Sequence, residues 1–198
     1  NKAIVTLLNG RVALWNISRN NRWPILLTHN LQIMNSQLLP DDHIATSGLD
    51  AKVKVWDLKN LGEYNTLNVE EDVWWMDYSA SSKRLFGIMC SGWVNAKGVM
   101  VWNWPDLSVH KKYMLPEDSS RVGIHPDGNI IAYSKGDDFS IQLYDLGKNQ
   151  NIQKLTHHAD LITHINFSPD GLKMLTASFD ETAKVYDMSD LSSDPVSI

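Results

Sequence analysis

At residues 53–57 the chain reads Val53-Lys54-Val55-Trp56-Asp57, a run that alternates apolar and polar residues and closes on an aromatic residue followed by an acid. Similar runs, each ending on Trp or Tyr and then Asp or Asn, are Val12-Ala13-Leu14-Trp15-Asn16, Val99-Met100-Val101-Trp102-Asn103, Ile141-Gln142-Leu143-Tyr144-Asp145 and Ala183-Lys184-Val185-Tyr186-Asp187. The aromatic residues fall 41, 46, 42 and 42 residues apart. This period is typical of a four-stranded unit and is too long for a helical hairpin repeat.

The last repeat indicates how each unit is built. Residues 162–167 alternate apolar and polar side chains, which predicts a half-buried strand. Ser168-Pro169-Asp170-Gly171 is a turn sequence, because Pro presets φ and Gly accepts a positive φ. Further strands are predicted over 173–178 and 182–186. A fourth strand per repeat is supplied by the segments 24–28, 66–69, 108–115 and 152–156.

Composition indicates a folded globular protein of 198 residues, with 43% hydrophobic and 21% charged residues. The net charge of −5 comes from acids scattered through predicted loops, and no basic stripe opposes them. Because binding to a phosphate backbone depends on clustered Lys and Arg, nucleic acid is not expected as a direct partner.

The single cysteine, Cys90, lies in an apolar run and is interpreted as a small buried side chain. No uninterrupted apolar stretch approaches the roughly 18 residues of a membrane-spanning helix, and no signal peptide opens the chain. A cytoplasmic or nuclear location is therefore expected.

These features resemble the WD40 family of β-propellers over essentially the whole chain. The resemblance implies that a hydroxyl, a loop histidine, a turn aspartate and the strand-ending aromatic residue are hydrogen-bonded to one another in each repeat. In the last repeat the matching residues are His158, Ser178, Asp180 and Tyr186.

The other repeats match this pattern less completely. In the second repeat His29, Asp50 and Trp56 fit, but Gly48 stands where the hydroxyl is expected. In the fourth, Asp138 is kept, Gly136 replaces the hydroxyl, and no histidine precedes the first strand. The third has neither histidine nor turn aspartate, and we expect a longer loop over 91–98 to account for the 46-residue spacing.

The predicted fold is an all-β propeller of four-stranded antiparallel blades, with about four and a half blades present. The blades are predicted at approximately 1–28 (partial), 29–69, 70–115, 116–156 and 157–198 (partial or complete). Propellers of the family it resembles commonly close with about seven blades. An unclosed array would expose unpaired strand edges, so we expect further blades in a parent protein or a partner that covers the gap.

No catalytic constellation emerges from the sequence. His157, His158 and His164 cluster, but the resemblance assigns His158 to the blade network and His164 lies on a predicted strand, so a metal site is not expected. The adjacent carboxylates at 41–42 and 137–138 are interpreted as solvated turn residues. Neither a glycine-rich phosphate loop nor a Gly-x-Ser-x-Gly elbow occurs. We therefore expect no enzyme activity, no cofactor and no bound metal.

The tryptophans are interpreted mainly as core residues. Those that end strands, Trp15, Trp56 and Trp102, are expected to be buried. Trp74 and Trp75 point to opposite faces of one strand, and both are expected to be buried because a blade packs against two others. Trp93 lies in the third repeat's predicted loop and is the best candidate for an exposed aromatic residue.

A propeller without catalytic groups is interpreted as a rigid scaffold or adaptor that binds proteins or peptides, within a multi-subunit complex. In the family it resembles, the residue before each turn aspartate tends to be exposed on the contact face. Here these residues are Phe179, Leu49 and Asp137, and the alternative is that they are incidental turn residues. Exposed Phe and Leu match the apolar anchors that dominate interface energies.

A more specific alternative comes from residues 44–59. They resemble the box of propellers that act as substrate receptors of cullin-RING ubiquitin ligases, in which a basic residue follows the tryptophan-aspartate pair by two positions. Lys59 stands there in place of the usual Arg, and lysine lacks the planar bidentate fork of a guanidinium group.

Overall fold

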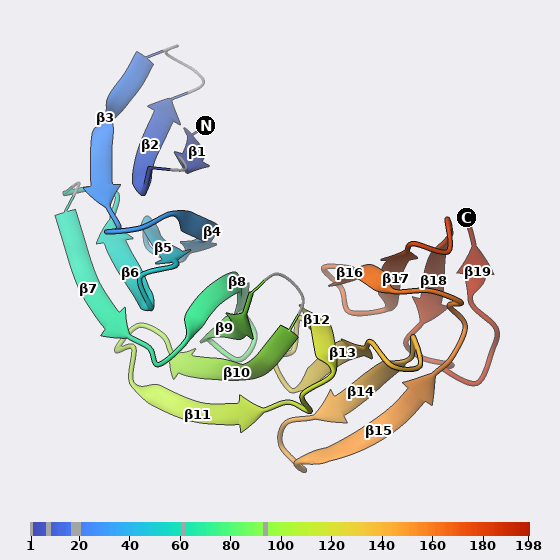
Figure 1. Cartoon of the computed structure of the whole chain (residues 1–198). Helices are drawn as coiled ribbons and strands as arrows, with labels where there is room; N and C mark the ends of the chain where they lie inside the picture. The colour runs from blue at the N-terminus through green and yellow to red at the C-terminus, as the bar shows by residue number, and fades with distance from the viewer. Residues whose placement is uncertain (1, 7–8, 17–20, 61, 93–94) are drawn as a thin grey trace. The chain divides into compact units, whose positions relative to one another are not determined.

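A computed structural model describes the chain except for residues 1, 7–8, 17–20, 61 and 93–94, and the side chains at 2–5 and 14–27 are also not described. The described residues contain strands and turns and no helix, so none of them forms a helix that could cross a membrane. The predicted all-β fold class is confirmed (Figure 1).

Antiparallel sheets follow one another along the chain, and in each the strands pair in sequence order. The first sheet has three strands, β1 (Lys2–Thr6), β2 (Arg11–Asn16) and β3 (Asn21–Thr28). The second has β4 (Ile33–Leu39), β5 (His43–Gly48), β6 (Lys52–Asp57) and β7 (Gly62–Asn68). The third has β8 (Asp72–Ser79), β9 (Arg84–Ser91), β10 (Asn95–Asn103) and β11 (Val109–Met114).

The last two sheets have the same order. One contains β12 (Ser119–Ile124), β13 (Ile130–Lys135), β14 (Ile141–Asp145) and β15 (Gln150–Leu155). The other contains β16 (Ile162–Phe167), β17 (Lys173–Ser178), β18 (Ala183–Asp187) and the short β19 (Val196–Ser197). Each four-stranded sheet has the size and strand order of one propeller blade.

The repeated pair, an aromatic residue followed by Asp or Asn, ends the third strand of every four-stranded sheet and the second strand of the first sheet. The third strand is an inner strand of each four-stranded sheet, paired with the second and the fourth. In β6, Val53 and Val55 are fully buried and Trp56 is 3% exposed. The predicted strands 162–167 and 173–178 agree with β16 and β17.

The third repeat differs from its prediction. The expected loop over 91–98 is mostly strand, because β9 continues to Ser91 and β10 begins at Asn95. The extra residues of this repeat therefore lengthen β9 and β10, to 8 and 9 residues, instead of forming a long loop.

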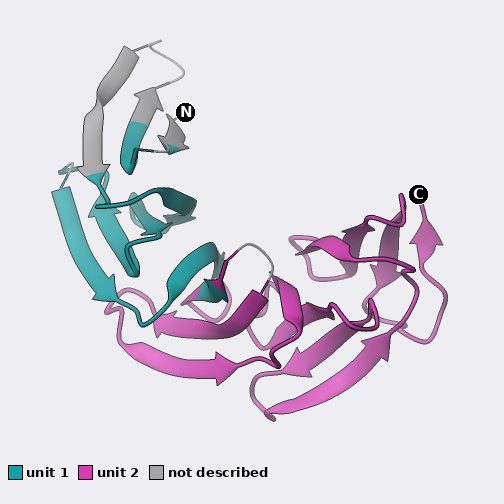
Figure 2. Cartoon of the chain, viewed as in Figure 1, with its two compact units in different colours: residues 1–78, 87–90 teal, residues 79–86, 91–198 magenta. Residues whose placement is uncertain are grey.

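The chain divides into two compact units, drawn in different colours in Figure 2. Unit 1 comprises 1–78 and 87–90, and unit 2 comprises 79–86 and 91–198. In unit 2 two apolar clusters fill the spaces between successive sheets. One joins β9–β11 with β12 and β13 through residues such as Phe86, Val101 and Ile131. The other joins β13 and β14 with β16–β18 through residues such as Leu143, Ile165 and Tyr186.

The expectation for the paired tryptophans is half correct. Trp74 is buried, at 4% exposed, whereas Trp75 is 40% exposed. Burial alternates along this part of β8, and Trp75 shares its exposed face with Asp77. Opposite faces of one strand thus have different surroundings here, which alternation alone could not reveal.

Candidate functional site

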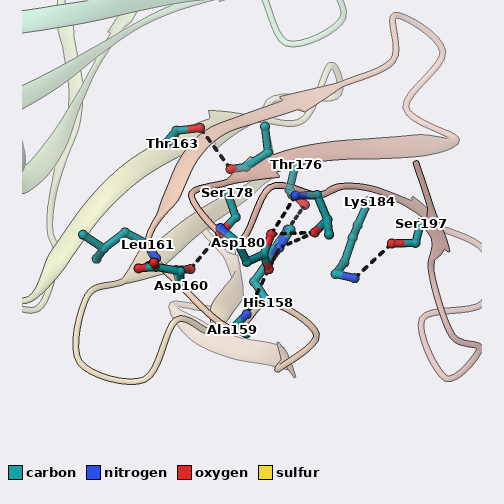
Figure 3. Close-up of polar contacts among 12 residues, drawn as sticks. His158, Ala159, Asp160, Leu161, Thr163, Thr176, Ser178, Asp180, Lys184 and Ser197 are labelled. Carbon is teal, nitrogen blue, oxygen red and sulfur yellow. Dashed lines mark hydrogen bonds and ion pairs between the residues drawn. The ribbon is translucent and has the colours of Figure 1, made fainter.

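A buried hydrogen-bond network holds the β17–β18 turn (Figure 3). His158 Nδ1 lies 2.8 Å from Asp180 Oδ2, and Nε2 lies 2.7 Å from Thr176 Oγ1. With the imidazole neutral, Nδ1–H donates to the carboxylate and the Thr176 hydroxyl donates to Nε2. The Asp180 carboxylate also accepts from the Ala159 and Thr182 N–H groups, both at 2.9 Å. The turn is therefore tied to the loop before β16.

The network hydroxyl in this sheet is Thr176 and not Ser178, so that sequence assignment is wrong. Ser178 Oγ instead donates to Asp160 O at 2.9 Å and accepts from Asp180 N–H at 3.1 Å. Residues two apart on a strand point to the same face. Both hydroxyls therefore suited the sequence pattern, and only the distance to His158 separates them. Tyr186 is buried, and burial raises the pKa of its hydroxyl to about 12. That hydroxyl has no hydrogen-bond partner among the described residues, so the expectation that the strand-ending aromatic residue is bonded within the network is wrong for Tyr186.

Unit 1 contains a second network of this kind. Trp56 Nε1–H donates to Thr46 Oγ1 at 2.8 Å, and the Thr46 hydroxyl lies 2.9 Å from His29 Nε2. His29 Nδ1 in turn lies 2.8 Å from Asp50 Oδ1. Thr46 is thus the hydroxyl that the sequence interpretation found missing at position 48.

Gly48 has a different role in that turn. A Cβ at this position would lie 2.8 Å from His29 Nδ1 and 2.9 Å from Gln32 O. Contacts below 3.0 Å cannot be accommodated without movement, so glycine permits the close approach of the histidine ring. The expectation that the second network lacks its hydroxyl is wrong, because Thr46 supplies that hydroxyl.

The carboxylates of both networks titrate below their ordinary range. Burial by itself would raise the pKa of Asp50 and of Asp180. Hydrogen bonds to the charged carboxylates outweigh that effect and lower both pKa values. Asp50 accepts from His29 and from Asn30 N–H, and Asp180 accepts from Thr182, Ala159 N–H and His158.

Acidification is therefore expected to destabilise the fold. Unfolded carboxyl groups titrate near pH 4, so the stabilisation by Asp50 and Asp180 is complete above that pH and is lost as the pH falls toward their lower folded pKa values. The test compares urea midpoints at pH 7 and pH 3. Asp180→Asn should shrink the difference between them. The control Glu117→Gln, in an exposed side chain, should leave it unchanged.

In the fourth repeat no histidine precedes the first strand, and ion pairs hold the turn between β13 and β14. Asp138 accepts from Lys154 Nζ and from Ser140 N–H, and these contacts lower its pKa to about 2. Lys135 Nζ lies 2.9 Å from Asp118 Oδ2 and 3.5 Å from Asp137 Oδ2. Around the turn between β13 and β14, the three carboxylates of Asp118, Asp137 and Asp138 thus outnumber the two ammonium groups of Lys135 and Lys154.

In each four-stranded sheet the turn between the second and third strands lies at the same end as the start of the first strand, since neighbouring strands are antiparallel. We call this the aspartate end, and it includes the turns at 48–51, 136–139 and 179–182. Phe179 lies there and is 66% exposed, and Leu49 is half-buried. Asp137 is also exposed there. Trp93 and the side chain of Trp15 lie outside the described residues.

Lys59 is not at this end. It follows β6, whereas Leu49 precedes it, so the two occupy opposite ends of the sheet. Its ammonium group is exposed and lies 3.8 Å from Asp42 Oδ2.

Two exposed leucines were missed by the sequence interpretation. Leu161 is 40% exposed and accepts from Phe179 N–H at 2.9 Å through its backbone oxygen. Leu31 is 55% exposed in unit 1, and the next residue, Gln32, accepts from Leu49 N–H at 2.9 Å. The sequence feature that could have identified both residues is a leucine in the loop just before the first strand of a sheet. The aspartate end thus presents Leu161 and Phe179, which are joined by a backbone hydrogen bond, in unit 2, and Leu31 and Leu49 in unit 1.

The histidines of the last repeat do not converge on one centre. His158 is buried in its network, His157 Nε2 lies 3.8 Å from Asp194, and His164 is exposed on β16. Within residues 2–6, 9–16, 21–60, 62–92 and 95–198, no group of three or more His, Cys, Asp or Glu could hold a metal ion.

Comparison with known proteins gives a family match at residues 149–187, to the WD domain, G-beta repeat (WD40). The chain is 28% identical over 134 residues to the serine-threonine kinase receptor-associated protein of Dictyostelium discoideum, covering 68% of this chain and 43% of that protein. The Gallus gallus protein of the same name is 24% identical over 174 residues, covering 87% and 48%. Periodic tryptophan protein 2 of Arabidopsis thaliana is 20% identical over 183 residues, covering 90% and 20%. The chain thus spans less than half the length of these relatives.

Proposed function

We propose that this chain, whose residues 149–187 match the WD40 repeat, is a non-catalytic scaffold or adaptor. We propose further that it binds partner proteins or peptides through the aspartate end of its sheets. The observation that carries this proposal is Phe179, a large aromatic side chain 66% exposed on a turn that is otherwise firmly held. Buried aromatic anchors dominate the binding energy of protein interfaces.

The rigidity of the turn supports a binding role. Phe179 N–H donates to Leu161 O, and the next residue, Asp180, is bound to His158 and to two backbone N–H groups. A side chain on a preorganised turn loses less conformational entropy when it binds a partner. Loops placed by a rigid scaffold are also where binding residues concentrate.

The names of the relatives point in the same direction. Two of them are named as associated with a serine-threonine kinase receptor. We carry over only association with other proteins, because the chain covers less than half of each relative. The partner's identity, membership of a larger complex and a cytoplasmic or nuclear location stay predictions.

The ligase-receptor alternative depends on Lys59. Nothing about this lysine in the structure favours that role over the general scaffold: it is exposed, lies near Asp42, and is at the opposite end of its sheet from Leu49. This alternative also stays a prediction, and Lys59→Ala tests it through recovery of a ligase adaptor.

Replacing Phe179 by alanine is expected to reduce recovery of at least one partner about tenfold or more, because an interface anchor is typically worth above 1 kcal/mol. The measurement is quantitative affinity purification of the full chain. Leu172→Ala is the matched control, since Leu172 is 57% exposed at the other end of β17. Equal partner profiles for wild type and Phe179→Ala would contradict a role for this face.

A further inference from the structure

Acidic side chains surround the apolar pair Leu161 and Phe179 in unit 2. They come from each of the loops and turns at the aspartate end of the two sheets: Glu117 and Asp118 before β12, Asp137 and Asp138 between β13 and β14, Asp160 before β16, and Glu181 between β17 and β18. Two lysines on neighbouring strands pair with these acids: Lys135 of β13 with Asp118 and Asp137, and Lys154 of β15 with Asp138.

The acids and the apolar pair form one continuous surface. Leu161 Cδ2 lies 3.9 Å from where a Cβ of Gly136 would be, so Leu161 packs beside the residue that precedes Asp137. Gly136 N–H donates to Asp118 O at 2.9 Å, which places the loop before β12 next to this turn. Phe179 N–H is bonded to Leu161 O on the other side.

The ion pairs leave this surface negative. Lys135 is shared between Asp118 and Asp137, so one cation faces two carboxylates. Lys154 neutralises Asp138, while Glu117 and Glu181 are exposed. A surface with excess negative charge attracts cationic partners and repels phosphates and acidic segments.

We infer that the aspartate end of unit 2 binds a peptide segment in which a large apolar side chain is flanked by lysine or arginine. The apolar side chain would pack on Leu161 and Phe179, and the cations would face Asp118, Asp137 and the exposed glutamates. This inference rests on the proposed function and names the chemical class of its partner.

Unit 1, taken by itself, has the same combination. Leu31 and Leu49 lie at its aspartate end, and Glu70, Glu71 and Asp72 follow β7 there. Burial raises the pKa of Asp72, and the negative charges of Glu71 and Asp50 raise it further.

The test uses the full chain and two sets of labelled 12-residue peptides. Both sets have a central Leu or Phe; the flanking positions carry Lys or Arg in one set and Glu or Asp in the other. Affinity is measured by fluorescence anisotropy at low and at moderate salt. We expect the basic peptides to bind at least tenfold more tightly than the acidic ones, and to weaken as salt rises. Equal or tighter binding of the acidic set would overturn the inference.

Variants locate the site. Phe179→Ala should weaken binding of the basic peptides about tenfold, and Asp137→Asn about threefold or more. Leu172→Ala and Asp127→Asn are the matched controls, since they lie at the opposite ends of β17 and β13, and they should change affinity less than twofold. Far-UV circular dichroism checks that each variant is folded. An equal loss in the controls would overturn the assignment to this face.

The outcome separates this inference from the proposed function. If partner recovery depends on Phe179 but the basic and acidic peptides bind alike, the scaffold function stands and the basic partner class is wrong. If basic peptides bind equally well to wild type and to Phe179→Ala, the proposed face is wrong.

Discussion

Replacing Trp102 by alanine is expected to lower the free energy of unfolding by about 3–5 kcal/mol, the usual cost of truncating a buried aromatic residue. Trp102 is the residue before the last of β10, is 1% exposed and is among the largest fully buried side chains of the described residues. Its removal leaves a cavity that the neighbouring strands, paired along their length, can fill only in part. The measurement is urea unfolding followed by far-UV circular dichroism, which does not depend on tryptophan fluorescence.

The control for this prediction is Trp75→Ala. Trp75 is the same residue type but is 40% exposed on β8, so it withdraws less apolar surface from water. We expect its substitution to cost less than half as much as that of Trp102. Similar costs for the two variants would contradict the difference in burial on which the prediction depends.

Replacing Thr46 by valine is expected to cost about 3 kcal/mol although it preserves the shape of the side chain. The substitution removes one hydroxyl but leaves two buried groups without their partner, Trp56 Nε1 and His29 Nε2. Each unsatisfied buried polar group costs about 1–3 kcal/mol. The readouts are the free energy of unfolding in urea and the NMR signal of the Trp56 indole N–H, which should shift.

Thr46→Ser is the matched variant because it keeps the hydroxyl and loses one methyl group. It is expected to cost only about 1 kcal/mol, near the value of one buried methylene. Thr66→Val provides a second control on the more accessible strand β7, where the hydroxyl donates to Glu63. If Thr46→Ser costs as much as Thr46→Val, the hydroxyl network does not stabilise unit 1 as described.

Strand positions were the most predictable part of the structure. The boundaries of β16 and β17 follow from the alternation of residues 162–167 and from the turn that begins at Ser168. These signals are local, because alternation and turn chemistry depend on residues that are neighbours in the chain. The same holds for the aromatic residues of β6, β10 and β18, which are buried as the pattern predicts.

The partners of the network histidines were not predictable in the same way. Thr176 and Ser178 have the same chemistry and point to the same face of β17, so sequence alone could not decide which hydroxyl reaches His158. In unit 1, the glycine at position 48 suggested a missing hydroxyl, whereas Thr46 supplies it two residues earlier. Such choices depend on distances between segments far apart in the chain.

Exposure at the aspartate end also required the tertiary structure. The resemblance directed attention to Phe179, but Leu161 beside it became evident only from the bond between Phe179 N–H and Leu161 O. The excess of acid around this pair likewise depends on Lys135 being shared by two carboxylates.

By itself, the sequence determined that this protein is built from repeated four-stranded antiparallel sheets, because the 41- to 46-residue spacing and the alternation within each run are properties of consecutive residues. The tertiary structure decided which hydroxyl completes each buried network, which tryptophan of β8 is exposed, and which apolar side chains meet the acids at the aspartate end. Those features depend on contacts between residues about 10 to 25 positions apart or in different sheets. A local pattern leaves such contacts open, and packing selects one of them.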